Sequence, residues 1–363
     1  MKNTLGTNLT VTLFGESHGP EIGAVLDGLA PGLRIDEDLI RHQLTLRRPA
    51  GDGLSTARAE TDPFRIVSGV LEGRTTGTPL CLLIPNADTR SRDYDRGMAR
   101  PGHADYTAEC KYHGFQDYRG GGHFSGRLTA PLVAAGAILI GALRTKGIRI
   151  GTHIASLAGI PDRQFGNLPA DLAELEARTF PVLDSAAAER MQDAIRSAAR
   201  DGDSVGGVLE TAVIGVPAGV GEPWFDSVEG VLARALFGIP AVKGVEFGSG
   251  FGFAEMRGSQ ANDGMRFADG RVSHLTNHNG GICGGITNGE AILLRLAVKP
   301  TPSIAREQKS IDLVTGENVD LTVHGRHDPA IVHRARVVAD SVIALVLADL
   351  LAGRYGTDWL APQ

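Results

Sequence analysis

The stretch of residues 128–143 restricts the fold most, because it is apolar on every side. A helix without a polar face is stable only where other elements cover it or inside a membrane. The stretch is shorter than the about 20 residues that usually span a bilayer, and it contains Pro131. It therefore predicts a helix buried in a protein core and no association with a membrane.

Glycine is the second constraint. The chain has 48 glycines in 363 residues, and runs such as Gly120-Gly121-Gly122 let backbone approach backbone or a ligand closely.

Short β-branched or apolar runs predict strands at residues 10–14, 22–27, 80–84, 208–216 and 291–298. Helical periodicity and capping residues predict helices at residues 36–45, 128–146, 171–178, 185–200 and 334–351. Because strands and helices alternate along the chain, the fold class is mixed α and β.

A weak internal similarity accompanies this order. Residues 22–33 resemble residues 206–220, and residues 126–143 resemble residues 332–351. In each half a strand comes first and an apolar helix follows, which suggests an internally duplicated α/β unit, with chance likeness of apolar strings as the alternative. No linker-like or low-complexity tract interrupts the chain, so we expect one domain over residues 1–363.

Charge and cysteine content exclude several classes of protein. The formal net charge is −6, which gives no general attraction to nucleic acid or to an anionic membrane surface. The three cysteines, Cys81, Cys110 and Cys283, form no CxxC pair, which argues against a disulfide framework and a zinc site. No apolar signal core develops near the N-terminus. These features predict a cytoplasmic protein whose anionic ligands are met by a local basic patch.

The string Gly15-Glu16-Ser17-His18-Gly19 fits the G-x-S-x-G nucleophile elbow of serine hydrolases. An elbow requires a helix directly after the serine and most of a sheet before it, whereas here a second strand follows and only about fourteen residues precede. The string therefore predicts a turn between two strands. His18, held among glycines with little reason to pack there, is the better functional candidate, with a satisfied turn histidine as the alternative.

Basic residues gather in loops. Residues 41–127 contain thirteen Lys and Arg against ten Asp and Glu. Arginine suits carboxylate and phosphate groups, so this part of the chain predicts an anion pocket, with a solvated surface as the alternative for any single cation. In "RPGHAD" rigid turn residues hold Arg100, His103 and Asp105 within six positions, and a histidine there could protonate a departing phosphate.

Two further segments carry the same chemistry. "HGRHDP" brings Arg326 and Asp328 together, and "KPTPS" places Lys299 beside two hydroxyls that could hold a second phosphate. Pairs such as His103 with Asp105 could also bind a metal, yet HExxH and cysteine clusters are absent from the sequence. No G-x-G-x-x-G follows a strand, so a nucleotide-like cofactor would bind outside a Rossmann fold.

Taken together, ten strings resemble the chorismate synthase family in their order, over nearly the whole chain from residue 14 to residue 329. They are FGESHG, RRP, SGVLEGRTTGTPL, RPGHADY, DYRGGG, AVKGVEFG, RGS, NHNGGICGG, KPTPSI and GRHDP. The resemblance implies a lyase that converts 5-enolpyruvylshikimate 3-phosphate to chorismate and phosphate by 1,4-anti elimination, with reduced FMN as cofactor. It also implies an α+β fold, a β-α-β sandwich, assembled as a homotetramer.

The resemblance assigns roles to particular residues. His18 would manage flavin protonation, His103 would protonate the leaving phosphate, and Asp328 would relay the proton abstracted near flavin N5. The residues implied to bind substrate are Arg47, Arg48, Arg100 and Arg326. The residues implied to bind FMN are Ser125, Gly126, Arg127, Pro240, Ala241, Gly284, Lys299, Pro300, Thr301, Pro302, Ser303 and Arg326. No metal ligand is implied.

The chain departs from the family near the flavin. Many members read GGRSSARE where this chain reads GGHFSGRL, with His123 and Phe124 in place of an Arg and a Ser, and a basic position after RRP is Gly53. Members with their own flavin reductase activity are usually longer, so we expect reduced FMN to come from an external reductase. A metal-assisted, phosphate-releasing hydrolase and a non-catalytic anion-binding protein are the rival hypotheses.

Overall fold

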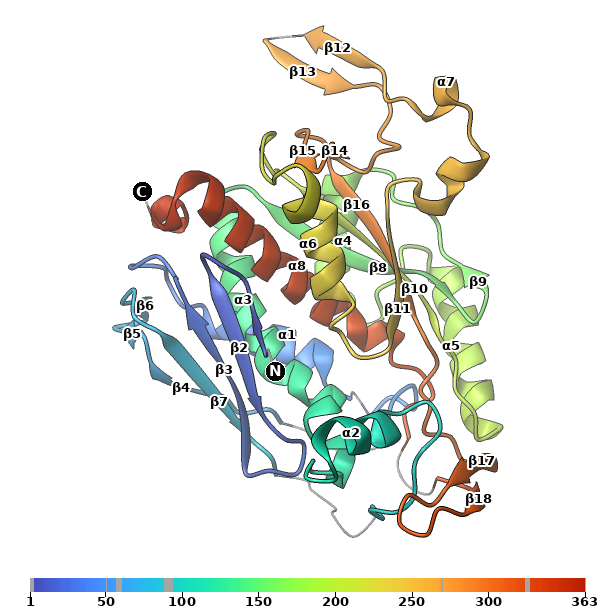
Figure 1. Ribbon diagram of the computed structural model, residues 1–363. Coiled ribbons are helices and arrows are strands. Elements are labelled where there is room, and N and C mark those ends of the chain that lie inside the picture. The colour runs from blue at the N-terminus through green and yellow to red at the C-terminus, as the bar shows by residue number, and fades with distance from the viewer. Residues whose placement is uncertain are drawn as a thin grey trace.

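The fold has three layers, in which two antiparallel sheets enclose a layer of helices (Figure 1). The computed structural model describes residues 3–49, 51–56, 61–87, 94–268, 270–323 and 327–362. Helices α1 (Glu37–Arg47), α3 (Thr129–Thr145) and α8 (Val332–Tyr355) pack against one another between the sheets. The α+β sandwich expected from the sequence is confirmed.

Both large sheets have five strands. The first has the order β1-β2-β3-β7-β4, with β1 (Thr4–Leu5), β2 (Thr10–Gly15), β3 (Glu21–Asp27), β7 (Leu80–Pro85) and β4 (Arg65–Ser68). The second has the order β11-β16-β10-β8-β9, with β11 (Val242–Phe247), β16 (Ile292–Val298), β10 (Gly207–Ile214), β8 (Arg149–Leu157) and β9 (Ile160–Pro161).

Smaller elements decorate this sandwich. Short hairpins pair β5 (Val70–Leu71) with β6 (Arg74–Thr75), β12 (Met265–Ala268) with β13 (Arg271–His274), β14 (Ile282–Cys283) with β15 (Ile286–Thr287), and β17 (Gln308–Ile311) with β18 (Asn318–Leu321). The other α-helices are α2 (Asp105–Tyr112), α4 (Leu168–Ala177), α5 (Ser185–Arg200), α6 (Val228–Leu236) and α7 (Gly258–Ala261).

All ten elements expected from the sequence are present, and their ends differ from the expected ones by a few residues.

Strand β8 is the main element that the sequence did not predict, because its buried centre is polar. Thr152 faces α8 and donates a hydrogen bond to Asp340 Oδ1 at 2.6 Å. His153 lies between two acids: its Nδ1 is 2.8 Å from Asp162 Oδ2, and its Nε2 is 3.0 Å from Glu210 Oε2. Burial opposes a charge on His153, but these carboxylates raise its pKa above the usual value.

The two halves share one topology. The first half runs β2, β3, β4, β7 and then α3, and the second runs β8, β10, β11, β16 and then α8. In space both sets of four lie in the same order, as β2-β3-β7-β4 and β8-β10-β16-β11. The strands and helices that resembled each other in sequence, β3 with β10 and α3 with α8, hold equivalent positions. The topology therefore agrees with a duplicated α/β unit.

The two equivalent helices cross closely at Gly136 of α3 and Ser341 of α8. A Cβ atom added at Gly136 would lie 2.2 Å from Ser341 Cβ and 2.6 Å from its Cα. Because part of this obstacle is backbone, only a shift of a whole helix could relieve it. Glycine at position 136 thus sets the spacing of the helix layer.

Gly136→Ala is expected to lower the free energy of unfolding by about 1–3 kcal/mol, the usual cost of overpacking a core. The matched control is Gly141→Ala on the same helix, where an added Cβ would meet only Leu39 Cδ2, at 3.5 Å. That change is expected to be neutral or stabilising, since alanine favours the helix more than glycine does. Urea unfolding of both variants measures the difference, and equal stabilities would contradict the close crossing.

The apolar stretch of residues 128–143 forms α3 and the turn before it. Residues Gly126–Thr145 make a helical segment of 20 residues, which extends beyond the apolar run at both ends and is long and apolar enough to cross a membrane. However, 83% of its most apolar window is buried inside the protein. The expectation of a buried core helix is confirmed.

Candidate functional site

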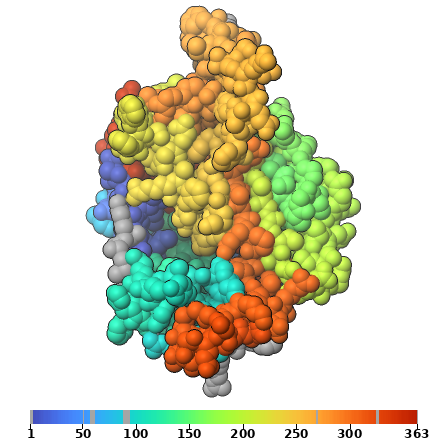
Figure 2. Space-filling model, turned by 45° about the vertical axis from the view of Figure 1, so that its right-hand side comes forward, coloured from blue at the N-terminus to red at the C-terminus, as the bar shows by residue number. Residues whose placement is uncertain are grey.

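Loops at one end of the sandwich enclose a cavity of about 1390 Å³. Five parts of the chain line it: the N-terminal strands, the segment with Arg47, Pro49 and Thr56, residues 94–132, residues 234–243, and the described residues of 299–342. Figure 2 shows the molecule hollowed between the cyan loops around α2 and the yellow segment that contains α6. A cavity of this size accommodates a cofactor together with a substrate.

The cavity is electropositive although the protein as a whole is acidic. Eight Lys and Arg line it against four Asp: Arg47, Arg96, Arg100, Arg127, Arg234, Lys243, Lys299 and Arg334 against Asp95, Asp105, Asp117 and Asp328. Such a concentration of one charge in a cleft attracts anions and raises their local concentration. The cavity is therefore basic as expected of an anion pocket, and Arg47, Arg96, Arg100 and Arg127 are the cations of residues 41–127 that are described in its lining.

His103 lies half-buried in this cavity. Its Nε2 is 2.6 Å from Ser303 Oγ, and Ser303 is 9% exposed. Burial, together with the charges of Arg100, Lys299 and His327, lowers the pKa of His103 to about 4, against the opposing effect of Asp105. His103 is therefore neutral at pH 7 in the ligand-free protein.

Arg100 is held by the acid that follows it in the same turn. Its Nε and Nη2 both donate to Asp105 at 2.8 Å, and its backbone N–H donates to the same carboxylate at 2.9 Å. The pair fixes the turn that carries His103. Arg100 also lines the cavity, so it contributes charge there while two of its donors are engaged.

His18 lies at the back of the triple-glycine turn. A Cβ atom at Gly120 would lie 2.5 Å from His18 Nε2, so a residue with a side chain there would displace the imidazole. The His18 ring meets Tyr94 edge to face, with centroids 5.3 Å apart. Both Gly120 and Tyr94 line the cavity, which places His18 at its wall. Glycine at position 120 therefore leaves the space that the His18 ring occupies.

The serine of the same string is no elbow nucleophile. Ser17 is 5% exposed and lies in the turn that joins β2 to β3, where its N–H donates to the carbonyl of Gly122. No helix follows it directly, as the sequence predicted. His123 Nδ1 donates to the carbonyl of Gly15 at 2.8 Å, so the histidine that departs from the family string joins the two turns.

Asp328 also lines the cavity. Its Oδ1 accepts a hydrogen bond from the backbone N–H of Thr56 at 2.9 Å and pairs with Arg334 Nη2 at 2.5 Å. Arg334, on the first turn of α8, is a cation that no sequence motif had indicated. Arg326, to which the resemblance gives a substrate and a cofactor role, lies outside the described residues.

Arg47 and Arg127 share one buried acid, Asp62. Asp62 accepts a hydrogen bond from Arg127 Nη1 and lies 3.7 Å from Arg47 Nε, and its side chain is fully buried. Arg127 also donates to Asn86 Oδ1 at 2.9 Å. Both arginines line the cavity. Arg48, the neighbour of Arg47, is not among the described residues that line it, and its Nη1 points to the carbonyl of Thr61 at 3.4 Å.

The residues implied to bind a flavin, apart from Arg326, divide into three groups. Those that line the cavity are Ser125, Gly126, Arg127, Pro240, Ala241, Lys299, Thr301, Pro302 and Ser303. Pro300 is exposed between two lining residues. Gly284 lies elsewhere, in the turn between β14 and β15. Phe124, whose place in the family string belongs to a serine, lines the cavity and is 43% exposed.

The donors present fit a phosphate-bearing flavin. Thr301 Oγ1 is buried and has no hydrogen-bond partner among the described residues, and it lies in the same loop as the ammonium group of Lys299. A buried hydroxyl without a partner beside a cation is a donor set for an anion. The cavity therefore offers one phosphate position at residues 299–303 as well as the basic wall around Arg100 and Arg334.

Cations from other elements, which sequence reasoning missed, also reach the cavity. Arg234 of α6 and Lys243 of β11 are exposed there, and no described acid pairs with either. Neither lies in a basic cluster of the sequence. The string "AVKGVEFG", which carries Lys243, was the one signal that could have indicated it.

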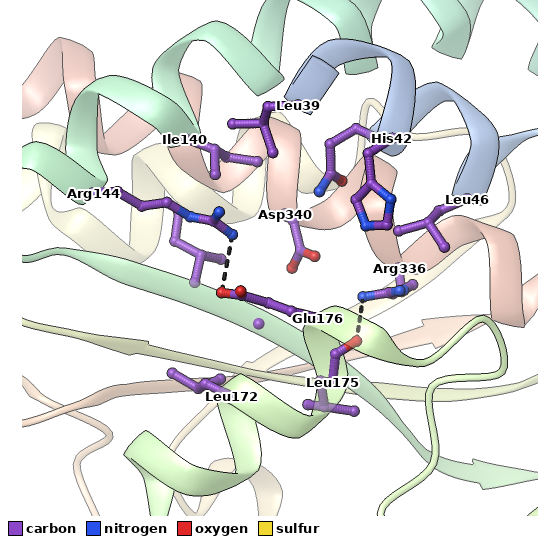
Figure 3. A pocket seen from close by; sticks show the side chains of 13 residues that line it. Leu39, His42, Leu46, Ile140, Arg144, Leu172, Leu175, Glu176, Arg336 and Asp340 are labelled. Carbon is purple, nitrogen blue, oxygen red and sulfur yellow. Dashed lines mark hydrogen bonds and ion pairs between the residues drawn. The ribbon is translucent and has the colours of Figure 1, made fainter. Parts of the chain in front are cut away.

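A second, much smaller cavity of about 50 Å³ lies between the helix layer and β8 (Figure 3). Asp340 and Arg336 of α8 point into it, and Arg144 pairs with Glu176 at its edge. Burial raises the pKa of Asp340 to about 6, against the opposing effect of Arg336. This cavity is too small for the substrate of an anion-binding enzyme, so the large cavity is the candidate active site.

The fold and the site define an enzyme class: a sandwich protein with a basic cavity, His103 and the carboxylate of Asp328 at its wall and His18 behind it, suited to proton transfer on an anionic small molecule. The family model for chorismate synthase matches residues 9–352. The chain belongs to the chorismate synthase family.

Individual relatives agree with this assignment. The chain is 46% identical to the chorismate synthase of Korarchaeum cryptofilum over 352 residues, which cover 95% of this chain and 96% of the relative. It is also 46% identical to that of Pyrococcus abyssi, over 96% of this chain and 97% of the relative. A solved structure titled "Crystal Structure of Chorismate Synthase" superposes with a TM-score of 0.77 at 30% identity, over 97% of this chain and 94% of that one.

Membership establishes a lyase of the shikimate pathway that forms chorismate on the way to the aromatic amino acids. Nothing favours the metal-assisted hydrolase. Among the described residues no group of three or more His, Cys, Asp or Glu side chains could hold a metal ion.

Proposed function

We propose that this chain converts 5-enolpyruvylshikimate 3-phosphate to chorismate and phosphate with reduced FMN bound in the large cavity, and that His18, His103 and Asp328 handle the protons. The substrate and the cofactor together carry two carboxylates and two phosphates. The observation that carries the proposal is the basic cavity, in which His103 and Asp328 line the wall and His18 lies directly behind it.

The elimination breaks a C–H bond at C6 and the C–O bond to phosphate. The electron pair of the C–H bond stays in the ring and forms the new conjugated diene, the proton is lost, and the electron pair of the C–O bond leaves with phosphate. A departing phosphate is stabilised by cations and by a proton. Arg100 and Arg334 supply the cations, and His103 supplies the proton. The charge of the bound phosphate raises the pKa of His103 from its low ligand-free value, so the substrate itself promotes protonation of its acid.

The other two groups serve the flavin side of the reaction. Lys299, Thr301 and Ser303 hold the FMN phosphate, with Ser125 to Arg127 and Pro240-Ala241 around the rest of the cofactor. Reduced flavin supplies electron density to the allylic system of the substrate. His18, held against Tyr94, sets the protonation of the bound ring, and Asp328 receives the proton lost from C6. An external reductase in the cytoplasm keeps the flavin reduced.

An anaerobic assay tests the proposal. Substrate is mixed with the protein and dithionite-reduced FMN, and released phosphate and chorismate absorbance are followed together. Equal amounts of both products are expected with reduced FMN, and neither with oxidised FMN or without flavin. Phosphate release with oxidised flavin and a divalent metal would instead support the hydrolase.

The proposed assembly is a homotetramer. The hairpin β12–β13 projects from the body (Figure 1), and it carries Met265, Phe267 and Val272, which are 71%, 74% and 59% exposed. A two-stranded hairpin with exposed apolar side chains is barely stable in water unless something covers it, and a second copy of the chain would do so. Light scattering that gives the mass of one chain would contradict this assembly.

A further inference from the structure

Two loops of the cavity, residues 100–105 and residues 299–303, are locked together. Lys299 Nζ donates to the carbonyl of Gly102 at 2.6 Å. Gly102 has φ +74°, and a Cβ atom added to it would lie 2.9 Å from Pro302 Cβ. The close approach therefore depends on glycine, both for its left-handed backbone and for its missing side chain. A loop with the donors for phosphate is held against the loop that carries His103.

A second hydrogen bond between the loops joins two side chains, and it ends on His103. Ser303 Oγ lies 2.6 Å from His103 Nε2, and the serine is buried. Among the described residues Nδ1 of the same ring has no hydrogen-bond partner. A fixed hydroxyl at one ring nitrogen sets the orientation of the imidazole, and when that nitrogen carries the proton the hydroxyl accepts its hydrogen bond.

The hydroxyl can serve both charge states of the ring. When His103 is protonated, Nε2–H donates to Ser303 Oγ, and Nδ1–H is the proton left to give. After transfer the ring is neutral and keeps its proton on Nε2, so the bond to Ser303 persists. The other described groups near the ring do not hold it in this way, because Arg100, Lys299 and His327 act on it by charge and Asp105 is engaged by Arg100.

We propose that Ser303 is a positioning residue for His103: its hydroxyl holds Nε2 and directs Nδ1 to the departing phosphate. This inference rests on the proposed function, because it takes His103 to be the acid. Ser303 then has two roles, since the loop that binds the cofactor phosphate also orients the acid. Binding of the cofactor phosphate and orientation of His103 therefore depend on the same loop.

The test uses full-length, flavin-free protein with ¹³C-labelled histidine side chains. The Cδ2 chemical shift distinguishes the two neutral tautomers, and the spectrum of His103→Ala identifies the His103 signal. At pH 7 the unmodified protein is expected to show the Nε2–H tautomer. Ser303→Ala is expected to give a mixture of tautomers, and Ser303→Thr, which keeps the hydroxyl, is expected to restore the Nε2–H form.

The matched control is Ser204→Ala. Ser204 Oγ donates to the carbonyl of Thr301 at 2.6 Å, so it braces the same loop without touching His103. This variant is expected to keep the Nε2–H tautomer. If Ser204→Ala gave the same mixture as Ser303→Ala, loosening of the loop would explain both results and the proposal would fail.

Turnover gives the second readout. With reduced FMN and substrate both saturating, Ser303→Ala is expected to lower kcat about tenfold, the effect of one hydrogen bond to a charged group, and Ser303→Thr to stay within about threefold of the unmodified enzyme. An unchanged tautomer in Ser303→Ala, or a loss confined to FMN affinity, overturns the inference. Failure of the proposed function is distinguishable, because it would appear as full turnover in His103→Ala whatever the tautomer of the ring.

Discussion

His103→Ala is expected to lower kcat by about 10²- to 10⁴-fold with substrate and reduced FMN saturating, because the variant lacks the group that protonates the leaving phosphate. The loss should appear in kcat more than in KM, since Arg100 and Arg334 still bind the anion. In the ligand-free protein burial and neighbouring cations keep the pKa of His103 near 4, so the proton must be taken up together with the substrate.

Anaerobic steady-state kinetics measure this loss. The control is His113→Asn, ten residues further along the chain, at a position with φ +56° that closes α2. Asparagine tolerates that backbone, so full activity is expected there. A companion NMR titration should show the pKa of His103 rising when inorganic phosphate is added. Full turnover in His103→Ala would assign the proton to another donor.

Asp62→Ala is expected to destabilise the protein by about 3–5 kcal/mol, because it leaves Arg47 and Arg127 buried without the acid between them. The side chains of the two arginines are only 5% and 10% exposed, so water cannot replace the lost carboxylate. Asp62 also has φ +48°, a backbone conformation that alanine adopts less readily than aspartate. The loss of the carboxylate and the unfavourable backbone conformation both lower the free energy of unfolding.

Asp62→Asn separates these two causes. Asparagine suits a positive φ and can still accept a hydrogen bond from Arg127, but it carries no charge. If the ion cluster matters, Asp62→Asn also loses stability in urea unfolding at pH 7, though less than Asp62→Ala. Asp62→Asn as stable as the unmodified protein, with Asp62→Ala lower by about 1 kcal/mol, would show that backbone strain and not charge explains the loss.

Much of the fold could be predicted from the sequence, because its elements have clear periodicity. The strongly amphipathic helix α5 begins and ends where its capping residues predict. Strand β8 was not predicted, because Thr152 and His153 are buried at its centre and their partners Asp340 and Glu210 lie far away in sequence. A polar residue that is satisfied only by tertiary contacts carries no local signal of burial.

In the candidate site, too, the residues with a local sequence signal could be predicted and the others could not. Turns that combine glycine or proline with a histidine, around His18 and His103, were recognisable because local chemistry marks them. Asp62, in contrast, acts only through arginines that lie 15 and 65 residues away, and Arg334 looks like an ordinary residue in the first turn of a helix. The roles of such groups depend on tertiary contacts, which no single segment of the sequence reveals.

The helix layer also has a consequence for how the chain is made. Helix α3 is complete at Thr145, but α8, which covers it, begins only at Val332. A ribosome that adds about 5–20 residues per second needs about 10 to 40 seconds for the residues between them. During that interval a helix that is apolar on every side has no α8 to pack against. Cellular yield should therefore depend on chaperones that protect the nascent first half until the second half arrives.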